Sequence, residues 1–125
     1  MLRRLLFPVA LVALLLAAAV AASAAVRTTA ATPVLSGEVG PGFTIDVERA
    51  GKDVKTVKPG TYKLKVEDKG SIHNFHLRGP GVNKSTGVSF VGEQTWTVKL
   101  KPGTYTYQCD PHASAGMKGT FKVKA

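Results

Sequence analysis

Three side chains with metal-binding chemistry lie close together near the end of the chain. Cys109, His112 and Met117 follow one another as C-x2-H-x4-M. A thiolate, an imidazole and a thioether are soft or borderline donors that copper accepts in both of its oxidation states. Taken singly, the cysteine or the methionine could be a core residue and the histidine an exposed turn residue. Beyond residue 24 there is one Cys and one Met in all, both beside this histidine, so the segment predicts a copper site.

The local sequence explains how these donors could face one point. Cys109 ends a strand-like run, and Pro111 stiffens the turn that follows. Gly116 lets the loop bend back, so that Met117 can face the same point as His112.

A copper site of this kind needs a second imidazole, and the chain offers His73 and His76. Within the apolar run 72–77, His73 alternates in phase with Phe75 and Leu77. His76 falls on the opposite face, which would leave it at the surface. Strand parity therefore favours His73, although a register error of one residue would exchange the two.

Other chemistries fit the same residues less well. Nucleophilic catalysis by Cys109 with His112 as base would need oxyanion donors and a substrate cleft, for which a domain of this size shows no sign. A c-type haem needs a second cysteine in C-x-x-C-H. Zinc gains nothing from a thioether ligand. We therefore expect a copper-binding protein without enzymatic activity.

The elements that must position the donors are short β-strands. Apolar and polar residues alternate with a period of two, which is typical of half-buried strands. The expected strands include 43–48, 62–67, 72–77, 94–100, 105–109 and 120–124. Lys58-Pro59-Gly60-Thr61-Tyr62 recurs as Lys101-Pro102-Gly103-Thr104-Tyr105, and each copy should turn the chain between strands. No convincing helical stripe follows residue 24. The pattern predicts an all-β Greek-key sandwich or flattened barrel.

From about residue 36 to 125 the chain resembles the cupredoxins, the small blue copper proteins of the plastocyanin and pseudoazurin type. The resemblance rests on His73-Asn74, on Pro102-Gly103-Thr104-Tyr105 leading to Cys109, on the C-x2-H-x4-M motif and on Gly119. It implies one type 1 copper ion that cycles between Cu(II) and Cu(I).

The resemblance also implies a role for each site residue. His73 Nδ1, Cys109 Sγ and His112 Nδ1 would be the equatorial ligands, and Met117 Sδ the weak axial ligand. Asn74 would connect the cysteine loop to the His73 segment through hydrogen bonds. Redox partners would dock on the apolar rim around His112, to which Pro111, Ala113, Ala115 and Gly116 would contribute.

Two features depart from plant plastocyanins. His73 and Cys109 are 36 positions apart, which is closer to the pseudoazurin or amicyanin layout. Gln108 stands where plant plastocyanins carry an exposed tyrosine, and their acidic patches have no counterpart. A photosynthetic partner is therefore not supported.

The N-terminus has the layout of a secretory signal peptide. Arg3 and Arg4 precede an apolar run over 5–20, and Ala22-Ser23-Ala24 resembles a cleavage site. We expect a signal peptide at 1–24 with a helical apolar run, a linker at 25–34 and the cupredoxin domain at 35–125. The protein would then be exported to the periplasm or the extracellular space. The alternative is an uncleaved membrane tether, for which the run is short.

The formal net charge of +9 becomes +7 when Arg3 and Arg4 are removed. An exported protein rarely meets nucleic acid, and many of the lysines alternate with apolar residues, so we expect no nucleic-acid partner. We expect a monomer that carries one electron between redox partners. The alternatives are a copper-delivery protein with the same ligands and a sandwich that binds no metal and acts in adhesion.

Overall fold

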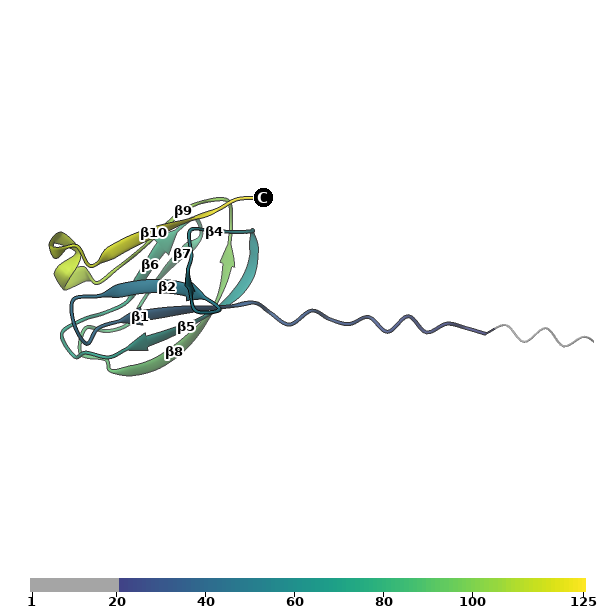
Figure 1. The fold of residues 1–125 in the computed structure, drawn as a ribbon, viewed down its shortest axis with the longest axis horizontal. Helices are drawn as coiled ribbons and strands as arrows, with labels where there is room; N and C mark the ends of the chain where they lie inside the picture. The colour runs from purple at the N-terminus through teal and green to yellow at the C-terminus, as the bar shows by residue number, and fades with distance from the viewer. Residues whose placement is uncertain (1–20) are drawn as a thin grey trace, which may run out of the picture.

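The computed structural model describes residues 21–125, and two packed β-sheets form its folded part (Figure 1). One sheet has the strand order β3-β2-β1-β5-β8 and the other β4-β10-β9-β6-β7. The prediction of an all-β Greek-key sandwich is thereby confirmed. The strands are β1 Val34–Val39, β2 Ile45–Arg49, β3 Lys52–Asp53, β4 Thr56–Val57, β5 Gly60–Asp68, β6 His76–Gly79, β7 Val82–Ser85, β8 Gly92–Leu100, β9 Gly103–Gln108 and β10 Lys118–Val123.

The two-residue period of the sequence explains why these segments are strands. In β5, Tyr62, Leu64 and Val66 point into the core, while the lysines between them are exposed. The adjacent strand β8 contributes buried residues in the same way. Burial of each large apolar side chain is worth about 1.5–3 kcal/mol, which makes this core the main source of stability.

Both copies of the Lys-Pro-Gly-Thr-Tyr motif carry the chain from one sheet to the other. The first joins β4 to β5, and the second joins β8 to β9. Gly60 and Gly103 have φ values of 150° and 147°, a region that favours glycine. The Tyr62 hydroxyl donates to Lys58 O at 2.7 Å, and the Tyr105 hydroxyl accepts from Lys101 N at 3.0 Å. In each copy of the motif, the tyrosine hydroxyl is therefore hydrogen-bonded to the backbone of the motif's lysine, which fixes the turn between the two sheets.

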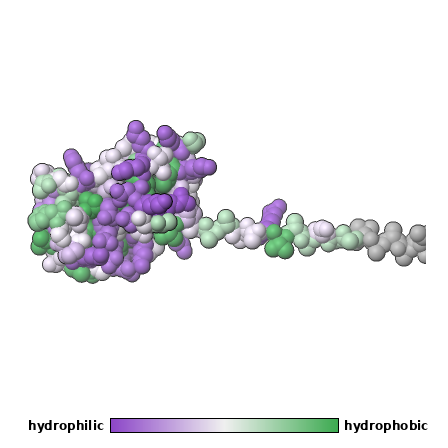
Figure 2. All heavy atoms as spheres, viewed as in Figure 1, coloured by the Kyte–Doolittle hydropathy of each residue, from purple (hydrophilic) through white to green (hydrophobic). Residues whose placement is uncertain are grey.

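The sandwich has two ends with different loops. The histidine pole is formed by residues 40–44, 69–75, 86–91 and 109–117. The lysine pole, at the opposite end, is formed by residues 49–60, 79–82, 99–103 and 122–125, and the chain enters the domain there, at Val34 (Figure 1). Figure 2 shows apolar side chains gathered at the first of these ends.

Two local expectations from the sequence are wrong. The alternation over 43–48 predicts that Phe43 belongs to a half-buried strand, but β2 begins at Ile45 and Phe43 is 63% exposed. The sequence predicts a strand over 72–77, but strand β6 begins only at His76 and ends at Gly79. Asp110–Ala115 also forms a short 3-10 helix, η1, which is too short to give an apolar stripe in the sequence.

The predicted signal peptide falls mostly on residues 1–20, which lie outside the described residues. Residues 21–33 have no regular secondary structure, and nearly all of them are exposed. In the part of the chain that the structure describes, no helix has the length and apolarity that a membrane crossing requires.

Candidate metal centre

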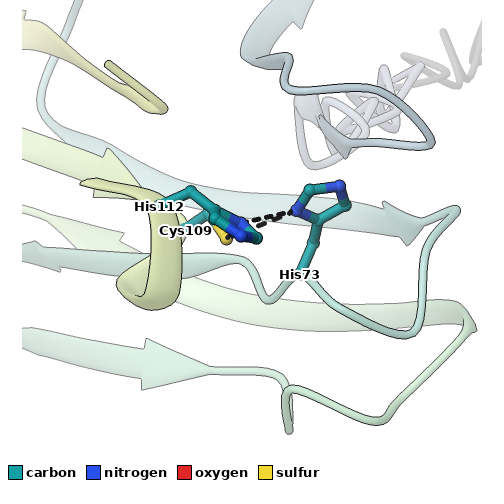
Figure 3. A group of neighbouring side chains, drawn as sticks. All are labelled: His73, Cys109 and His112. Carbon is teal, nitrogen blue, oxygen red and sulfur yellow. Dashed lines mark hydrogen bonds between the residues drawn. The ribbon is translucent and has the colours of Figure 1, made fainter. Parts of the chain in front are cut away.

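Three donor atoms from two distant parts of the chain meet at the histidine pole (Figure 3). The Nδ1 atoms of His73 and His112 are 3.1 Å apart. Cys109 Sγ lies 3.6 Å from the first nitrogen and 3.5 Å from the second. The structure therefore brings His73, and not His76, to the cysteine and to His112.

The spacing of the three atoms suits a metal ion. They lie on a circle with a radius of about 2.0 Å, close to the ~2.0–2.1 Å of a bond from a metal ion to imidazole nitrogen and the ~2.3 Å of a bond to thiolate. A thiolate with two imidazoles in a trigonal arrangement is the donor set of blue-copper sites. The residues present therefore fit copper.

The imidazole of His73 is fixed by its surroundings. The side chain is completely buried, and its Nε2 lies 3.3 Å from the carbonyl oxygen of Pro41. Donation of the Nε2 proton to this carbonyl leaves the lone pair of Nδ1 directed at the site. The backbone of Gly40 lies against the same ring, where a Cβ atom would come within 2.9 Å of His73 Cδ2. The loop before β2 thus sets both the tautomer and the position of this histidine.

The loop that holds the other donors is closed by backbone hydrogen bonds. Cys109 N donates to Met117 O at 3.0 Å, and Met117 N donates to His112 O at 3.2 Å. Gly116 ends η1 with a φ of 96°, which returns the chain toward β10. Cys109 and Met117 are buried, while His112 is half-buried, so this histidine reaches toward the surface.

Asn74 connects the two ligand segments. Its Nδ2 donates to Asp110 Oδ2 at 2.9 Å, and its Oδ1 accepts from Asp110 N at 2.7 Å. The first residue after His73 is in this way bonded twice to the first residue after Cys109. Pro111 follows at the start of η1, in one of the first two helical positions, where its missing N–H costs nothing.

Asp110 is held in its charged form by its partners. Burial would by itself raise the pKa of this carboxyl, but hydrogen bonds from Gln108, Asn74 and His76 lower its pKa to about 2. His76 Nδ1 lies 2.9 Å from Asp110 Oδ2, and its Nε2 lies 2.6 Å from Asn83 Oδ1. His76 is half-buried and bonded at both nitrogens, whereas strand parity predicts a surface residue.

Strand alternation favours the correct histidine, His73, but alternation is not what places His73 at the site. Residues 73–75 are consecutive and all buried, so their side chains do not alternate as in a strand. The backbone turns here, with His73 N donating to Gly70 O at 3.1 Å. His73 is brought to the site by this turn.

Sequence reasoning missed the contact of Phe43 with the site. Its ring meets both imidazoles edge to face, with centroid distances of 5.6 Å to His73 and 4.8 Å to His112. Phe43 and Ile45 follow the two-residue spacing of a strand, so the sequence pattern gave no indication that Phe43 contacts the site. The position beside Pro41 and Gly42, a sequence that favours a turn, was the available signal.

Known copper-binding proteins are similar to this chain in sequence and in fold. A sequence profile described as copper-binding proteins of the plastocyanin/azurin family matches residues 43–124. Amicyanin-alpha of Methylorubrum extorquens is 34% identical over 119 residues, which cover 90% of this chain and 98% of that protein.

Solved structures agree. Reduced rusticyanin is similar with a TM-score of 0.55 and 27% identity over 77% of this chain and 81% of the other. Rusticyanin from Thiobacillus ferrooxidans gives a TM-score of 0.54 and 30% identity, with 77% and 79% covered. The fold and the donor set define a cupredoxin. The chain belongs to the plastocyanin/azurin family of copper-binding proteins, and its cofactor is type 1 copper.

Proposed function

We propose that this cupredoxin is a one-electron carrier, in which Met117 completes the ligand set as the weak axial donor. The observation that carries the proposal is the preformed site: two donor residues are fully buried, and the third reaches the surface. When bound, copper would supply a centre that accepts and releases a single electron.

The chain's own residues keep the rearrangement small. The carbonyl of Pro41 holds His73, and the paired hydrogen bonds of Asn74 hold the loop of Cys109 and His112. Donor atoms fixed before the electron arrives need little movement during transfer, which favours a fast reaction.

We further propose that redox partners dock at the histidine pole, over His112. Pro111, Ala115 and Gly116 are exposed around this residue, and Ala113 is half-buried. The same pole exposes larger apolar side chains, namely Phe43 (63%), Ile72 (55%), Val88 (43%) and Val91 (57%). A small apolar surface suits a short-lived complex between two carriers. On this proposal the protein acts as a monomer.

The export of the protein belongs to the same proposal. Signal peptide 1–24 and linker 25–34 would deliver the domain 35–125 to the periplasm or beyond, where small redox carriers can diffuse between partners. N-terminal sequencing of the protein recovered from the cell envelope tests the expected cleavage after Ala24. Retention of residues 1–24 would support a membrane tether instead.

Voltammetry of the copper-loaded protein, with stopped-flow exchange against a cytochrome, tests the carrier function. A reversible one-electron wave and rapid exchange are expected. A copper-delivery protein would instead pass its ion to a metal-free acceptor, and exchange of electrons would be slow. Transfer of copper on the timescale of mixing would contradict the carrier proposal.

A further inference from the structure

Basic residues are concentrated at the lysine pole. All eight basic side chains of segments 49–60, 99–103 and 122–125 are exposed, and Asp53 is the one acidic residue in these segments. Acidic residues gather elsewhere: Asp46, Glu38, Glu67 and Glu93 are register partners in a single row across the first sheet. The charge is therefore separated along the molecule.

These cations have no acidic partners. Within residues 21–125, the lysine ion pairs are Lys65 with Glu93 at 3.0 Å and Lys69 with Glu38 at 2.8 Å. Neither involves the lysine pole. Unpaired like charges repel one another, so a surface of this kind is stabilised by binding negative charge.

The lysine pole contains a hollow. A hollow of about 630 Å³ is lined by the cationic side chains of Arg49, Lys58 and Lys124, together with Tyr62 and the end of the chain at Ala125. The guanidinium carbon of Arg49 lies 6.0 Å from the centre of the Tyr62 ring, which restricts the arginine. Guanidinium and ammonium groups around a hollow are suited to the oxygens of phosphate groups.

The chain enters the domain at this same pole. Lys63 N donates to Pro33 O at 3.0 Å, directly before β1. Residues 21–33 link this point to the apolar run 5–20, and thirteen residues can span at most about 45 Å. A membrane that receives the apolar run during export therefore lies within reach of the basic surface.

We propose that the lysine pole rests on a membrane surface that contains anionic lipids, whose phosphate groups are bound around the hollow. The histidine pole then faces away from the membrane. A redox partner is a poorer candidate for the lysine pole, because it would bind at the opposite end from His112. The proposal goes beyond electron transfer, and it would hold for the metal-free protein too.

Vesicle binding of the exported protein, as the cell processes it, tests this. The quantity measured is the ratio of two binding constants: that for phosphatidylcholine vesicles with 30% phosphatidylglycerol, and that for vesicles of pure phosphatidylcholine. A retained apolar run would insert into both kinds of vesicle, so its contribution cancels in the ratio. We expect a ratio well above one that falls steeply with added salt. Lys58→Gln/Lys124→Gln should lower the ratio by roughly fivefold per lysine. The control Arg78→Gln/Lys84→Gln removes the same charge from exposed positions in β6 and β7 and should change the ratio by less than about threefold.

A ratio near one or an equal loss in both variants would overturn the proposal. So would displacement of the protein by millimolar inorganic phosphate, which would indicate a site for small anions. Stronger binding to a heparin-like polyanion than to the vesicles would assign the surface to another partner. Reduction of vesicle-bound copper protein by a soluble reductant should proceed within about twofold of the free rate. A large slowing would place the histidine pole against the membrane.

Discussion

At the scale of single residues, the two histidines of the site have different surroundings. The ring of His73 is enclosed by backbone and bonded at Nε2, whereas His112 belongs to a short loop and is half-buried. The exposed ring of Phe43 contacts both imidazoles. We expect such edge-to-face contacts to restrict the imidazoles and to limit the access of water to them.

Replacement of Phe43 tests this role. Phe43→Ala should lower the reduction potential, because water at the imidazoles favours the more highly charged Cu(II) state. The expected change is less than about 60 mV, which corresponds to a tenfold change in a one-electron equilibrium. Phe43→Leu should retain most of the potential, and Val91→Ala serves as the control at an exposed apolar site. An unchanged potential in Phe43→Ala would show that the ring has no effect on the site.

The proposed axial ligand is tested by Met117→Leu, which keeps the volume of the buried side chain. Loss of a thioether donor removes more stabilisation from Cu(II) than from Cu(I), so the potential should rise by about 60 mV or more. Voltammetry measures the shift. A potential equal to that of the wild type would remove Met117 from the ligand set.

At the scale of elements, the site depends on the link between the turn before β6 and the loop after β9. Asn74→Ala would leave Asp110 N without its partner and should cost about 1–3 kcal/mol of unfolding free energy. The copper spectrum should also broaden, since the two ligand segments would no longer be held together. Asn83→Ala, which removes a partner of His76 only, is the matched control and should leave the spectrum unchanged.

The lowered pKa of Asp110 predicts a dependence of stability on pH. Because its pKa is about 2 in the folded state and 3.8 ordinarily, the charged form stabilises the fold above pH 4, and this contribution is lost as the pH falls toward 2. The side chain is 42% exposed, so we expect only about 1 kcal/mol. Denaturant titrations of metal-free wild type and Asp110→Asn should converge between pH 4 and 2. A constant difference between the two proteins would contradict the prediction.

The sequence predicts the sandwich well, because alternation in segments such as 62–67 reports directly on burial. It also predicts the donors in the C-x2-H-x4-M loop, which are adjacent in the chain. It fails where the backbone leaves the strand pattern: the turn at 70–75 buries three successive residues, and the loop before β2 exposes Phe43. Contacts such as that of Pro41 with His73 join segments 32 residues apart, and periodicity carries no information on them.

At the scale of the whole molecule, the ligands join parts of the chain that are 36 residues apart. Ligation should therefore stabilise the complete fold. Free copper at a thousand times its dissociation constant should add about 4 kcal/mol to the free energy of unfolding. Calorimetry of the metal-free and loaded protein measures the difference. A rise of similar size in Cys109→Ser would show that copper binds elsewhere.

The two poles of the molecule divide its proposed roles. The histidine pole combines the metal site with exposed apolar residues, and the lysine pole carries unpaired cations at the point where the chain enters. On this division, lysine substitutions at the second pole should alter membrane binding and leave the copper spectrum intact.

The most direct test of the copper site is the visible and EPR spectrum of the copper-loaded protein beside that of Cys109→Ser. The wild type should show an intense blue thiolate absorption and the EPR signal of a type 1 site, and the serine variant should lose both. A blue Cys109→Ser protein, or a wild type that stays colourless with Cu(II), would contradict the assignment of Cys109 as a copper ligand.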